Sequence, residues 1–454
     1  MAVLSAVLIH GEAGGFEKTE PFIYRGTITD FEARLALARV LSFSDRTLEE
    51  ALNEYRNLVA LYPENATVRA ETARLLLWLG KLNGALKELR VALSEEPFNI
   101  EALYQWGQAN CLSGLNSISV RAYEELLAEY PLYESGAKAL GRAGLALRPQ
   151  AETSYSYWSE RGRDELSGIS RGKTDTGFSV PLHKNIRVGL SALYLEERAH
   201  FNNRTFTAPG FNAHIEGALN RYFQGGASWT VKSYSEGPGG TNTGNIHFDI
   251  YLHDGFRLGL GYEKTDEFYN LFGLEQGVQA RSYMLGADVY PSRRISLQTD
   301  ARYSEYSDEN RGEYVLLSLG YAFGAHPVKL RLSLSGEYRD TEKESISVFE
   351  EGRLKDIVHS YWTPQNYYAG GASVEWGRDY GESFCGAKKQ NYSLRLSLGT
   401  DSEQNPPFFK MLIFRLDGEW THEFERFGAS LRFLLHRSEL WNAEAFRVDL
   451  KCIF

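Results

Sequence analysis

The sequence predicts an α + β protein in which a short N-terminal α-helical repeat domain, at 29–149, precedes an antiparallel transmembrane β-barrel of about 16 strands, at 152–454. Two observations carry this prediction. Before Pro149, amphipathic helical segments recur at a constant spacing. After Pro149, apolar residues recur at every second position, which is the period of a β-strand, as far as the last residue of the chain.

Length, charge and hydropathy are consistent with this class. The chain has 454 residues and a net charge of −10, which leaves room for two domains and argues against a nucleic-acid partner. It contains no apolar run long enough to cross a bilayer as a helix, so an α-helical membrane span is excluded. The mean hydropathy of −0.37 still suits a membrane barrel, because the residues that face its lumen are polar.

The first fifteen residues, 1–15, are interpreted as a possible secretory signal segment. Met1 to Ile9 is apolar, and Gly11-Glu12-Ala13 is similar to a small-residue cleavage pattern. A basic segment before the apolar run is missing, so we expect that the start codon lies upstream. The alternative is a disordered or helix-capping N-terminus.

Three prolines mark a repeat in the helical region. Pro63, Pro97 and Pro131 are equally spaced along the chain, and each follows an amphipathic segment. Small residues keep the same spacing: Ala51 and Ala85 lie twelve residues before their prolines. Two helices must approach each other closely at such positions.

This interval, a 34-residue period with a closing proline, resembles the tetratricopeptide repeat, a helix–turn–helix unit. Ala73 and Gly107, twenty-four residues before their prolines, support the resemblance, whereas Arg39 and Ser119 replace the usual small residues. We count two good repeats, one degenerate repeat and a capping helix at 133–147. The resemblance implies a stacked solenoid whose concave surface binds a partner, although so short an array could also be a spacer or plug.

Alternation in the second domain continues over long segments. In the last strand, Phe446, Val448, Leu450, Cys452 and Phe454 alternate with Arg447, Asp449, Lys451 and Ile453. A final strand of this pattern that ends in Phe resembles the signal by which bacterial outer-membrane barrels are recognised for assembly. We therefore interpret Phe446, Val448, Leu450, Cys452 and Phe454 as an assembly signal for the barrel-assembly machinery.

Strand length, aromatic residues and loop lengths distinguish a membrane barrel from a soluble sandwich. Strands of about ten residues suit a tilted membrane strand. Short turns at 183–185, 253–255, 291–294 and 324–327 interleave with longer loops near 200–210, 236–244, 268–277 and 340–365. Aromatic residues gather at strand ends, as in an interfacial girdle: Tyr155, Tyr157, Trp158, Tyr262, Tyr303, Tyr321, Phe323, Trp376 and Trp420.

The same alternation predicts which side chains face the lumen. The candidates are charged residues that alternate with apolar ones: Arg257, Asp300, Arg302, Lys329, Arg331, Arg395, Arg415, Asp417, Arg447, Asp449 and Lys451. Both signs are present, which suits a hydrated path for a neutral or weakly charged polymer. All water-filled barrels have charged linings, however, so single positions carry little weight.

Tetratricopeptide repeats followed by a barrel of this length resemble the outer-membrane proteins that export exopolysaccharides such as cellulose and poly-N-acetylglucosamine. Tyr361-Trp362-Thr363-Pro364-Gln365-Asn366-Tyr367 is similar to a segment before a late strand in the cellulose-export family, with Tyr361, Pro364, Gln365 and Tyr367 as the family-like residues. Those proteins carry more repeats than the three here.

The resemblance implies an outer-membrane conduit for a secreted polysaccharide in a Gram-negative bacterium, with the helical domain in the periplasm. Expected partners are outer-membrane lipid, the barrel-assembly machinery, the polysaccharide, and periplasmic or inner-membrane synthase components. A general porin, a phage receptor and a structural barrel remain alternatives. A barrel enzyme is the weakest, because no G-x-S-x-G motif is present and His359, His422 and His436 have no obvious serine partner. No cofactor or metal site is expected, since the three cysteines are far apart.

Overall fold

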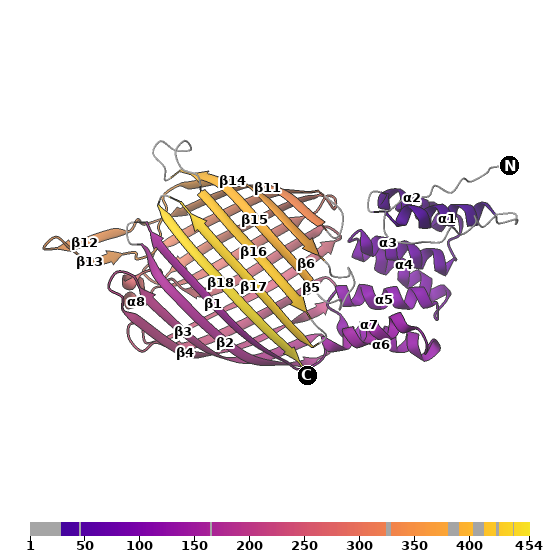
Figure 1. The fold of residues 1–454 in the computed structure, drawn as a ribbon, viewed down its shortest axis with the longest axis horizontal. Coiled ribbons are helices and arrows are strands. Elements are labelled where there is room, and N and C mark those ends of the chain that lie inside the picture. Colours follow the sequence, from indigo (N-terminus) through magenta and orange to yellow (C-terminus); the bar gives the residue numbers. More distant parts are fainter. Residues whose placement is uncertain are drawn as a thin grey trace, which may run out of the picture.

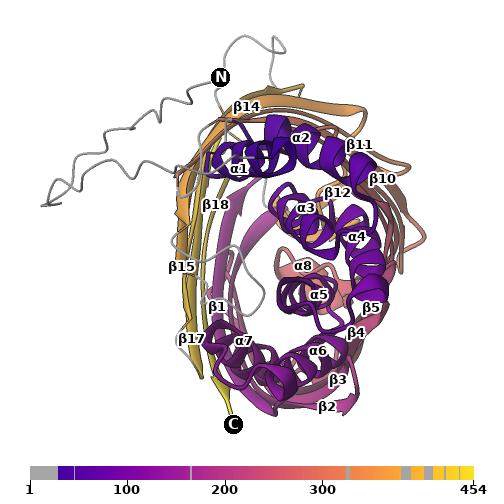
Figure 2. The ribbon, with the colours of Figure 1, turned by 90° about the vertical axis from the view of Figure 1, so that its right-hand side faces the viewer.

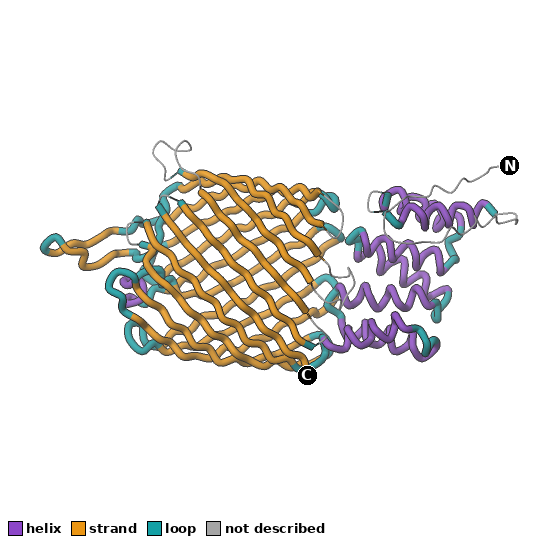
Figure 3. The backbone as a smooth tube through the Cα atoms, viewed as in Figure 1, coloured by secondary structure: helices purple, strands orange, loops and turns teal. Residues whose placement is uncertain are grey.

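The computed structural model describes residues 29–44, 47–163, 166–323, 328–379, 390–402, 413–423, 426–438 and 440–454. The possible signal segment at 1–15 lies outside these residues. A row of helices is followed by a barrel of tilted strands (Figures 1 and 3). No helix among the described residues is long and apolar enough to span a membrane.

The described part of the helical domain contains seven helices, which form three antiparallel pairs and a final single helix. In chain order they are α1 (Asp30–Ser42), α2 (Leu48–Leu61), α3 (Ala66–Trp78), α4 (Leu82–Glu95), α5 (Ile100–Leu112), α6 (Asn116–Glu129) and α7 (Glu134–Leu145). The starts of α3, α5 and α7 are separated by the same interval as the three prolines, and so are the starts of α2, α4 and α6. The period read from the prolines is therefore the period of the helix pairs.

The small residues of the repeat lie where the helices meet. Ala51, Ala85 and Ser119 are fully buried. A Cβ atom at Gly107 would lie 2.5 Å from the ring of Tyr123, so only glycine allows α5 and α6 to approach this closely. Two buried apolar clusters together extend from α1 to α7, and Leu93 of α4 packs against both.

The described strands of the second domain include sixteen that close into one antiparallel barrel. They are β1 (Gln150–Gly162), β2 (Ser167–His183), β3 (Ile186–Ala199), β4 (Thr205–Asn220), β5 (Phe223–Ser233), β6 (Gly240–His253), β7 (Phe256–Asp266), β8 (Gln279–Val289), β9 (Ile295–Tyr306), β10 (Arg311–Phe323), β11 (Val328–Thr341), β14 (Tyr367–Asp379), β15 (Gln390–Asp401), β16 (Ile413–Glu423), β17 (Phe427–Arg437) and β18 (Trp441–Ile453). Each strand of the barrel pairs with the barrel strands before and after it along the chain, and β18 pairs with β1. Closure leaves no edge strand with unpaired backbone groups, which a bilayer would not tolerate.

The barrel carries an apolar outer surface. Leu332 on β11 lies opposite Val374 on β14, which lies opposite Leu396 on β15, and all three side chains are exposed. Their chain neighbours Arg331 and Arg395 belong to the other face. An exposed leucine-rich belt of this kind is the surface that a bilayer covers.

The aromatic girdle is visible on three adjacent strands. Tyr262 on β7, Tyr283 on β8 and Tyr303 on β9 lie directly opposite one another near one end of the barrel. Trp158 was expected in the same girdle, and this expectation is wrong. Trp158 is a chain neighbour of the outward Tyr157 and lines the interior with Arg331, because successive residues of a strand face opposite sides.

The two ends of the barrel differ, and we call the end beside the helices proximal and the other distal. The described turns after β2, β4 and β6 lie at the proximal end and contain two residues each. Longer connections lie at the distal end, including α8 (Leu271–Gln276) between β7 and β8 and the hairpin β12 (Ile346–Glu350)–β13 (Arg353–Val358) between β11 and β14 (Figure 1).

Two of the expected distal loops are shorter than the alternation indicated. The loop near 200–210 ends where β4 begins at Thr205, and the loop near 236–244 ends where β6 begins at Gly240. Polar residues and glycines at the start of these two strands interrupt the apolar alternation, so the length of each strand was underestimated. The turn at 324–327 and most of the segment at 378–390 lie outside the described residues.

The barrel supplies N-terminal caps to the helical domain. Asp254, in the turn between β6 and β7, accepts hydrogen bonds from the backbone N–H groups of Asn83 (2.6 Å) and Gly84 (3.0 Å) in α4. Asn185, in the turn between β2 and β3, accepts from the N–H of Ser117 in α6 (3.1 Å). Neither helix has a side-chain cap of its own, so the barrel turns satisfy N–H groups that would otherwise lack a protein partner.

Candidate conduit through the barrel

Most of the inward charged side chains form ion pairs, either within one strand or between nearby strands. For the predicted lumen residues the nitrogen–oxygen distances are as follows: Arg257–Asp288 2.7 Å, Arg257–Asp249 3.5 Å, Arg302–Glu263 3.5 Å, Arg395–Glu375 2.6 Å, Arg395–Asp417 3.9 Å, Arg415–Asp417 3.5 Å, Arg447–Asp449 2.7 Å and Lys451–Glu152 3.5 Å. Arg331 donates to the hydroxyl of Ser296 instead. Pairing reduces the net field of the lining, so the interior presents many polar groups without a strong excess of one sign.

The structure brings five of the predicted lumen residues into one interior cavity of about 720 Å³. These are Asp300, Arg331, Arg395, Arg415 and Asp417, from β9, β11, β15 and β16. Of the others, Arg302 lines a smaller adjoining cavity of about 290 Å³, and Lys451 lines a hollow of about 380 Å³ at the proximal end. Arg257, Lys329, Arg447 and Asp449 belong to the lining of none of these three spaces.

Aromatic rings share the larger cavity with these charges, and sequence reasoning assigned none of them to the interior. They come from strands, turns and the distal loops: Trp158, Tyr269, Tyr306, Tyr314, Tyr361, Trp362, Tyr367 and Trp441. Alternation along the strand could have placed Trp158 and Tyr314 in the interior, because both lie next to outward residues. Those in loops had no periodicity to reveal them.

The loop that carries α8 folds into the barrel at its distal end. Phe268, Leu271 and Leu274 are buried against the inward residues Ile169 of β2 and Leu195 of β3. In the axial view, α8 projects inside the ring of strands (Figure 2). The loop therefore fills the interior beside β2–β4, and the cavity remains on the opposite side.

The family-like segment is also folded inward and is anchored by both backbone and side chains. Pro364 O accepts from the backbone N–H (2.9 Å) and the hydroxyl (3.0 Å) of Thr341, and Gln365 Nε2 donates to Thr341 O (2.8 Å). Tyr361 is buried and its ring stacks on Tyr306, with centroids 4.2 Å apart. Pro364 and Gln365 thus hold the later part of the segment at β11, while Tyr361 holds its start at β9.

Asp308 fixes the inner part of this segment. Its two carboxylate oxygens contact Tyr361 Oη (3.0 Å) and His359 Nδ1 (2.7 Å). Burial, and next the charge of Asp308, raise the pKa of Tyr361, so its hydroxyl stays protonated and donates to the carboxylate. His359, considered at first as a possible catalytic histidine, is thus part of a loop anchor.

Trp362 lies at the centre of a stack that crosses the distal interior. The centroid of its ring is 3.7 Å from the guanidinium carbon of Arg163 and 5.1 Å from that of Arg339. Arg163 also lies 4.5 Å from the ring of Trp441, and Arg339 lies 4.7 Å from that of Tyr314. Rings and guanidinium groups alternate in this stack, an arrangement stabilised by the attraction between a cation and an aromatic face.

The stack and the tyrosine contact connect opposite walls. Tyr306 ends β9 and Arg163 follows β1, and these strands are eight steps apart in the ring of sixteen. The adjacent residues Tyr361 and Trp362 contact both. The segment at 359–367 therefore spans the distal end of the barrel.

One serine–histidine pair was missed in the sequence, and its geometry argues against nucleophilic catalysis. Ser170 Oγ lies 2.6 Å from His200 Nε2, while Arg161 Nε donates to His200 Nδ1 (3.1 Å). Because Nδ1 accepts this bond, the ring proton is on Nε2 and His200 donates to the serine. A general base needs the reverse arrangement, in which Nδ1–H donates to a carboxylate and the unprotonated Nε2 accepts the proton of the serine. Among the described residues, no group of three or more His, Cys, Asp or Glu could hold a metal ion.

Comparisons with known proteins agree with both domains. Residues 42–105 match the tetratricopeptide repeat family. Among solved structures, the chain is similar to a "Bacterial polysaccharide outer membrane secretin", with a TM-score of 0.52 and 14% identity over 68% of this chain and 99% of that chain. Other matches are Acinetobacter baumannii OccAB3 (TM-score 0.34, 9% identity, 68% and 98% covered) and Pseudomonas aeruginosa OccK7 (0.35, 11%, 68% and 99%). No curated protein matches the chain.

Fold and comparisons together define the class. The chain is a tetratricopeptide-repeat domain joined to a closed sixteen-strand β-barrel of the outer-membrane type. At 14% identity, the likeness to the polysaccharide secretin shows the barrel fold alone.

Proposed function

We propose that this protein is an outer-membrane conduit for the export of a secreted polysaccharide, with its helical-repeat domain on the periplasmic side. The observation that carries the proposal is the interior cavity, in which aromatic rings lie among paired charges. Sugar rings offer C–H faces that pack on aromatic rings and hydroxyls that bind charged groups, so one lining can hold them in many weak contacts.

The pairing of charges favours a neutral or weakly charged polymer over an ionic solute. Arg395 and Arg415 both lie within 4 Å of a carboxylate oxygen of Asp417, so neither presents a free positive charge to a passing anion. A solved structure that shares this barrel fold is named as a polysaccharide secretin, which supports the proposal.

A general diffusion porin is less consistent with the distal end. There the α8 loop occupies the interior beside β2–β4, and the segment at 359–367 spans to the wall at Arg163. A long polymer would need this segment to move, and its anchors at Asp308 and Thr341 are hydrogen bonds that can break and re-form.

In the outer membrane, the protein would contact four kinds of partner. Bilayer lipid would cover the leucine-rich belt, and the barrel-assembly machinery would recognise the strand that ends at Phe454. The helical domain, held over the proximal end by Asp254 and Asn185, would meet the polymer or periplasmic and inner-membrane synthase components. A nucleic-acid partner is not expected, given the net charge of −10.

A deletion strain tests the proposal. It should lose surface polysaccharide while the polymer accumulates in the periplasm, and the full chain should restore secretion. A fragment that ends at Pro149 should not, because the barrel is the path. If the deletion strain secretes every polymer normally but resists a phage or loses uptake of a small solute, the protein is a receptor or porin instead.

A further inference from the structure

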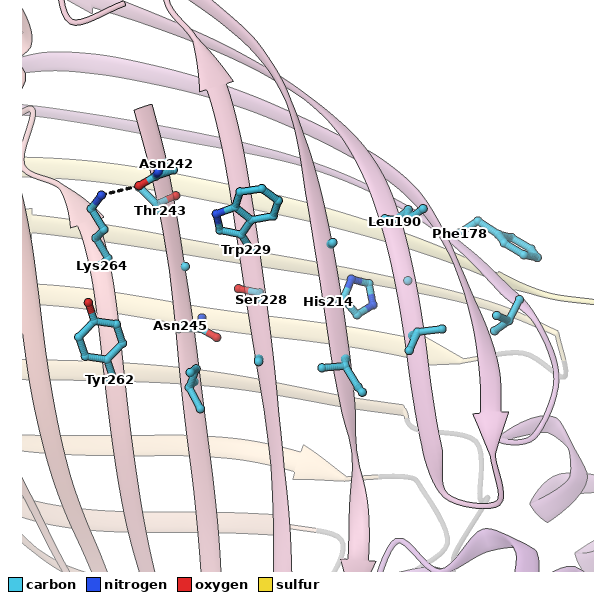
Figure 4. A pocket seen from close by; sticks show the side chains of 18 residues that line it. Phe178, Leu190, His214, Ser228, Trp229, Asn242, Thr243, Asn245, Tyr262 and Lys264 are labelled. Carbon is cyan, nitrogen blue, oxygen red and sulfur yellow. Dashed lines mark hydrogen bonds between the residues drawn. The ribbon is translucent and has the colours of Figure 1, made fainter. Parts of the chain in front are cut away.

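The outer wall of the barrel has a hollow of about 910 Å³ that lies across β2–β7 (Figure 4). Small outward residues on three adjacent strands, Ala213, Ala227 and Gly244, leave space between larger side chains. Trp229 and Leu190, which border the hollow, are 60% and 70% exposed. A continuous apolar groove is thus present on the surface that we assign to the bilayer.

A pair of cations lies at the distal end of this groove. Lys264 on β7 lines the groove, and Arg281 on β8 lies directly opposite it on the same outward face. Both are one outward position beyond Tyr262 and Tyr283, the girdle residues, whose rings are 5.6 Å apart. Lipid headgroups lie at the level just outside such a girdle.

The charge balance at this edge is positive. Lys264 donates a hydrogen bond to the side-chain oxygen of Asn242, which orients its ammonium along the groove edge (Figure 4). Glu305, on β9, lies opposite Arg281, so two cations and one carboxylate follow each other on three strands. The next residue of the row, Arg311 on β10, pairs with Glu342 instead (3.8 Å).

We propose that this surface is a binding site for a phosphate-bearing lipid of the surrounding bilayer. The acyl chain lies in the groove between Leu190 and Trp229, and the phosphate binds Lys264 and Arg281. Charge-assisted hydrogen bonds from two cations to one phosphate are strong, and they fix the headgroup where the groove begins. The inference rests on the membrane location proposed above but not on what the lumen carries.

Native mass spectrometry of the full-length protein in detergent micelles tests this site. The probes are dioleoyl phosphatidic acid, chain-matched dioleoylglycerol and inorganic phosphate. Phosphatidic acid should remain bound to the wild type more tightly than either of the others. The double variant Lys264→Gln/Arg281→Gln should weaken its affinity by roughly tenfold, because the charge-assisted bonds are lost.

Two further variants separate the contribution of the lipid headgroup from that of the acyl chain. Ala213→Phe/Ala227→Phe fills the groove while keeping both cations, and it should also weaken the binding of phosphatidic acid. Arg311→Gln removes an outward cation of the same row outside the groove, and it should leave the affinity unchanged. Heat-modifiable migration on a gel confirms that each variant is folded.

Three results would overturn the proposal. The first is equal affinity of phosphatidic acid for the wild type and the Lys264→Gln/Arg281→Gln variant. The second is inorganic phosphate binding as tightly as phosphatidic acid, since the groove would then contribute nothing. The third is a wild-type dimer that the filled groove dissociates without a change in lipid binding, which would make a second copy the occupant. A protein that binds this lipid but exports no polymer would refute the proposed conduit alone.

Discussion

Arg39 occupies a repeat position at which Ala73 and Gly107 stand in the next two units. Its side chain reaches across to α3, where Arg39 Nη2 lies 2.5 Å from Glu71 Oε1. Tyr55 Oη donates to the other oxygen of Glu71 (2.8 Å). The Glu71 side chain is only 9% exposed, so these two donors satisfy a carboxylate that could not otherwise be buried.

The Glu71 site makes the stability of the helical domain depend on pH. Burial by itself raises the pKa of Glu71, but the hydrogen bonds from Arg39 and Tyr55 outweigh it, and the net pKa is lowered. A lowered pKa in the folded state contributes stability above the unfolded pKa, about 4.3, and this contribution is lost as the pH falls through the folded value.

We therefore expect the free energy of unfolding of the helices to fall on acidification below about pH 5. In Glu71→Gln this dependence should be weaker, and Arg39→Ala should cost about 1–3 kcal/mol at pH 7. Circular dichroism at the helical band, on the full chain, measures both. Arg34→Ala is the control, because its partner Asp30 is exposed and the loss should be small. An equal loss in the two arginine variants would contradict the assigned role of Glu71.

At the scale of elements, the repeat and the barrel are matched to each other. Asn83 and Ser117 are equivalent positions in successive repeats, and each donates its N–H to a barrel turn. In contrast, α3 and α5 are capped by their own Asn65 and Asn99. Thus α3 and α5 carry their own caps, whereas α4 and α6 are capped by turns of the barrel.

Removal of a barrel cap should loosen the helical domain. Asp254→Ala and Asn185→Ala should each cost about 1 kcal/mol, the usual value of an N-cap side chain. Proteolysis of the folded chain should then cut the helices faster, while the barrel stays resistant. Asp254→Ser keeps an acceptor oxygen and should restore most of the protection. If the alanine variants are cleaved at the wild-type rate, the turns do not hold the helices.

The segment at 359–367 should obstruct the path through the barrel. Trp362→Ala removes the ring between Arg163 and Arg339, so the single-channel conductance of the reconstituted protein should rise severalfold. Trp376→Ala removes an exposed ring on the outer face and should not alter conductance. Unchanged conductance in the first variant would mean that the open path avoids this segment.

At the scale of the molecule, the C-terminus completes the barrel. The backbone N–H of Phe454 donates to Pro149 O (3.0 Å), at the junction between the two domains, and its ring lies 6.3 Å from that of Phe178. Phe454 therefore contacts Pro149, directly before β1, and Phe178 of β2. Its proposed role in assembly remains a prediction.

Deletion of Phe454, or Phe454→Asp, should lower the amount of barrel in the outer-membrane fraction several-fold, with degradation of the unassembled chain. The terminal ring would no longer be present for recognition, and the charged residue would face lipid. Heat-modifiable migration distinguishes folded from unfolded protein. Phe427→Asp changes another exposed outward aromatic residue beside β18 and should have the smaller effect. Normal yields of both Phe454 variants would show that the terminal ring is not a signal.

The sequence by itself determined both repeating architectures. A period of two assigns each strand residue to one face without knowledge of its neighbours, so Leu332 and Arg331 could be placed on opposite faces from the chain alone. The interval between the prolines similarly predicted the helix pairs and the tight contact at Gly107. Both periods could be read from the sequence because each is set by the local geometry of the backbone, in strands and in helices.

Only the tertiary structure decided how the interior and the junction are arranged. Asp254 caps α4 from 171 residues away, and Trp362 meets Arg163 from across the ring of strands. Loop residues such as these have no periodicity, and their partners are set by barrel closure, which brings strands eight steps apart to face each other. A side chain whose partner is fixed by closure cannot be assigned from its neighbours in the chain, because the contact exists only after every strand has paired.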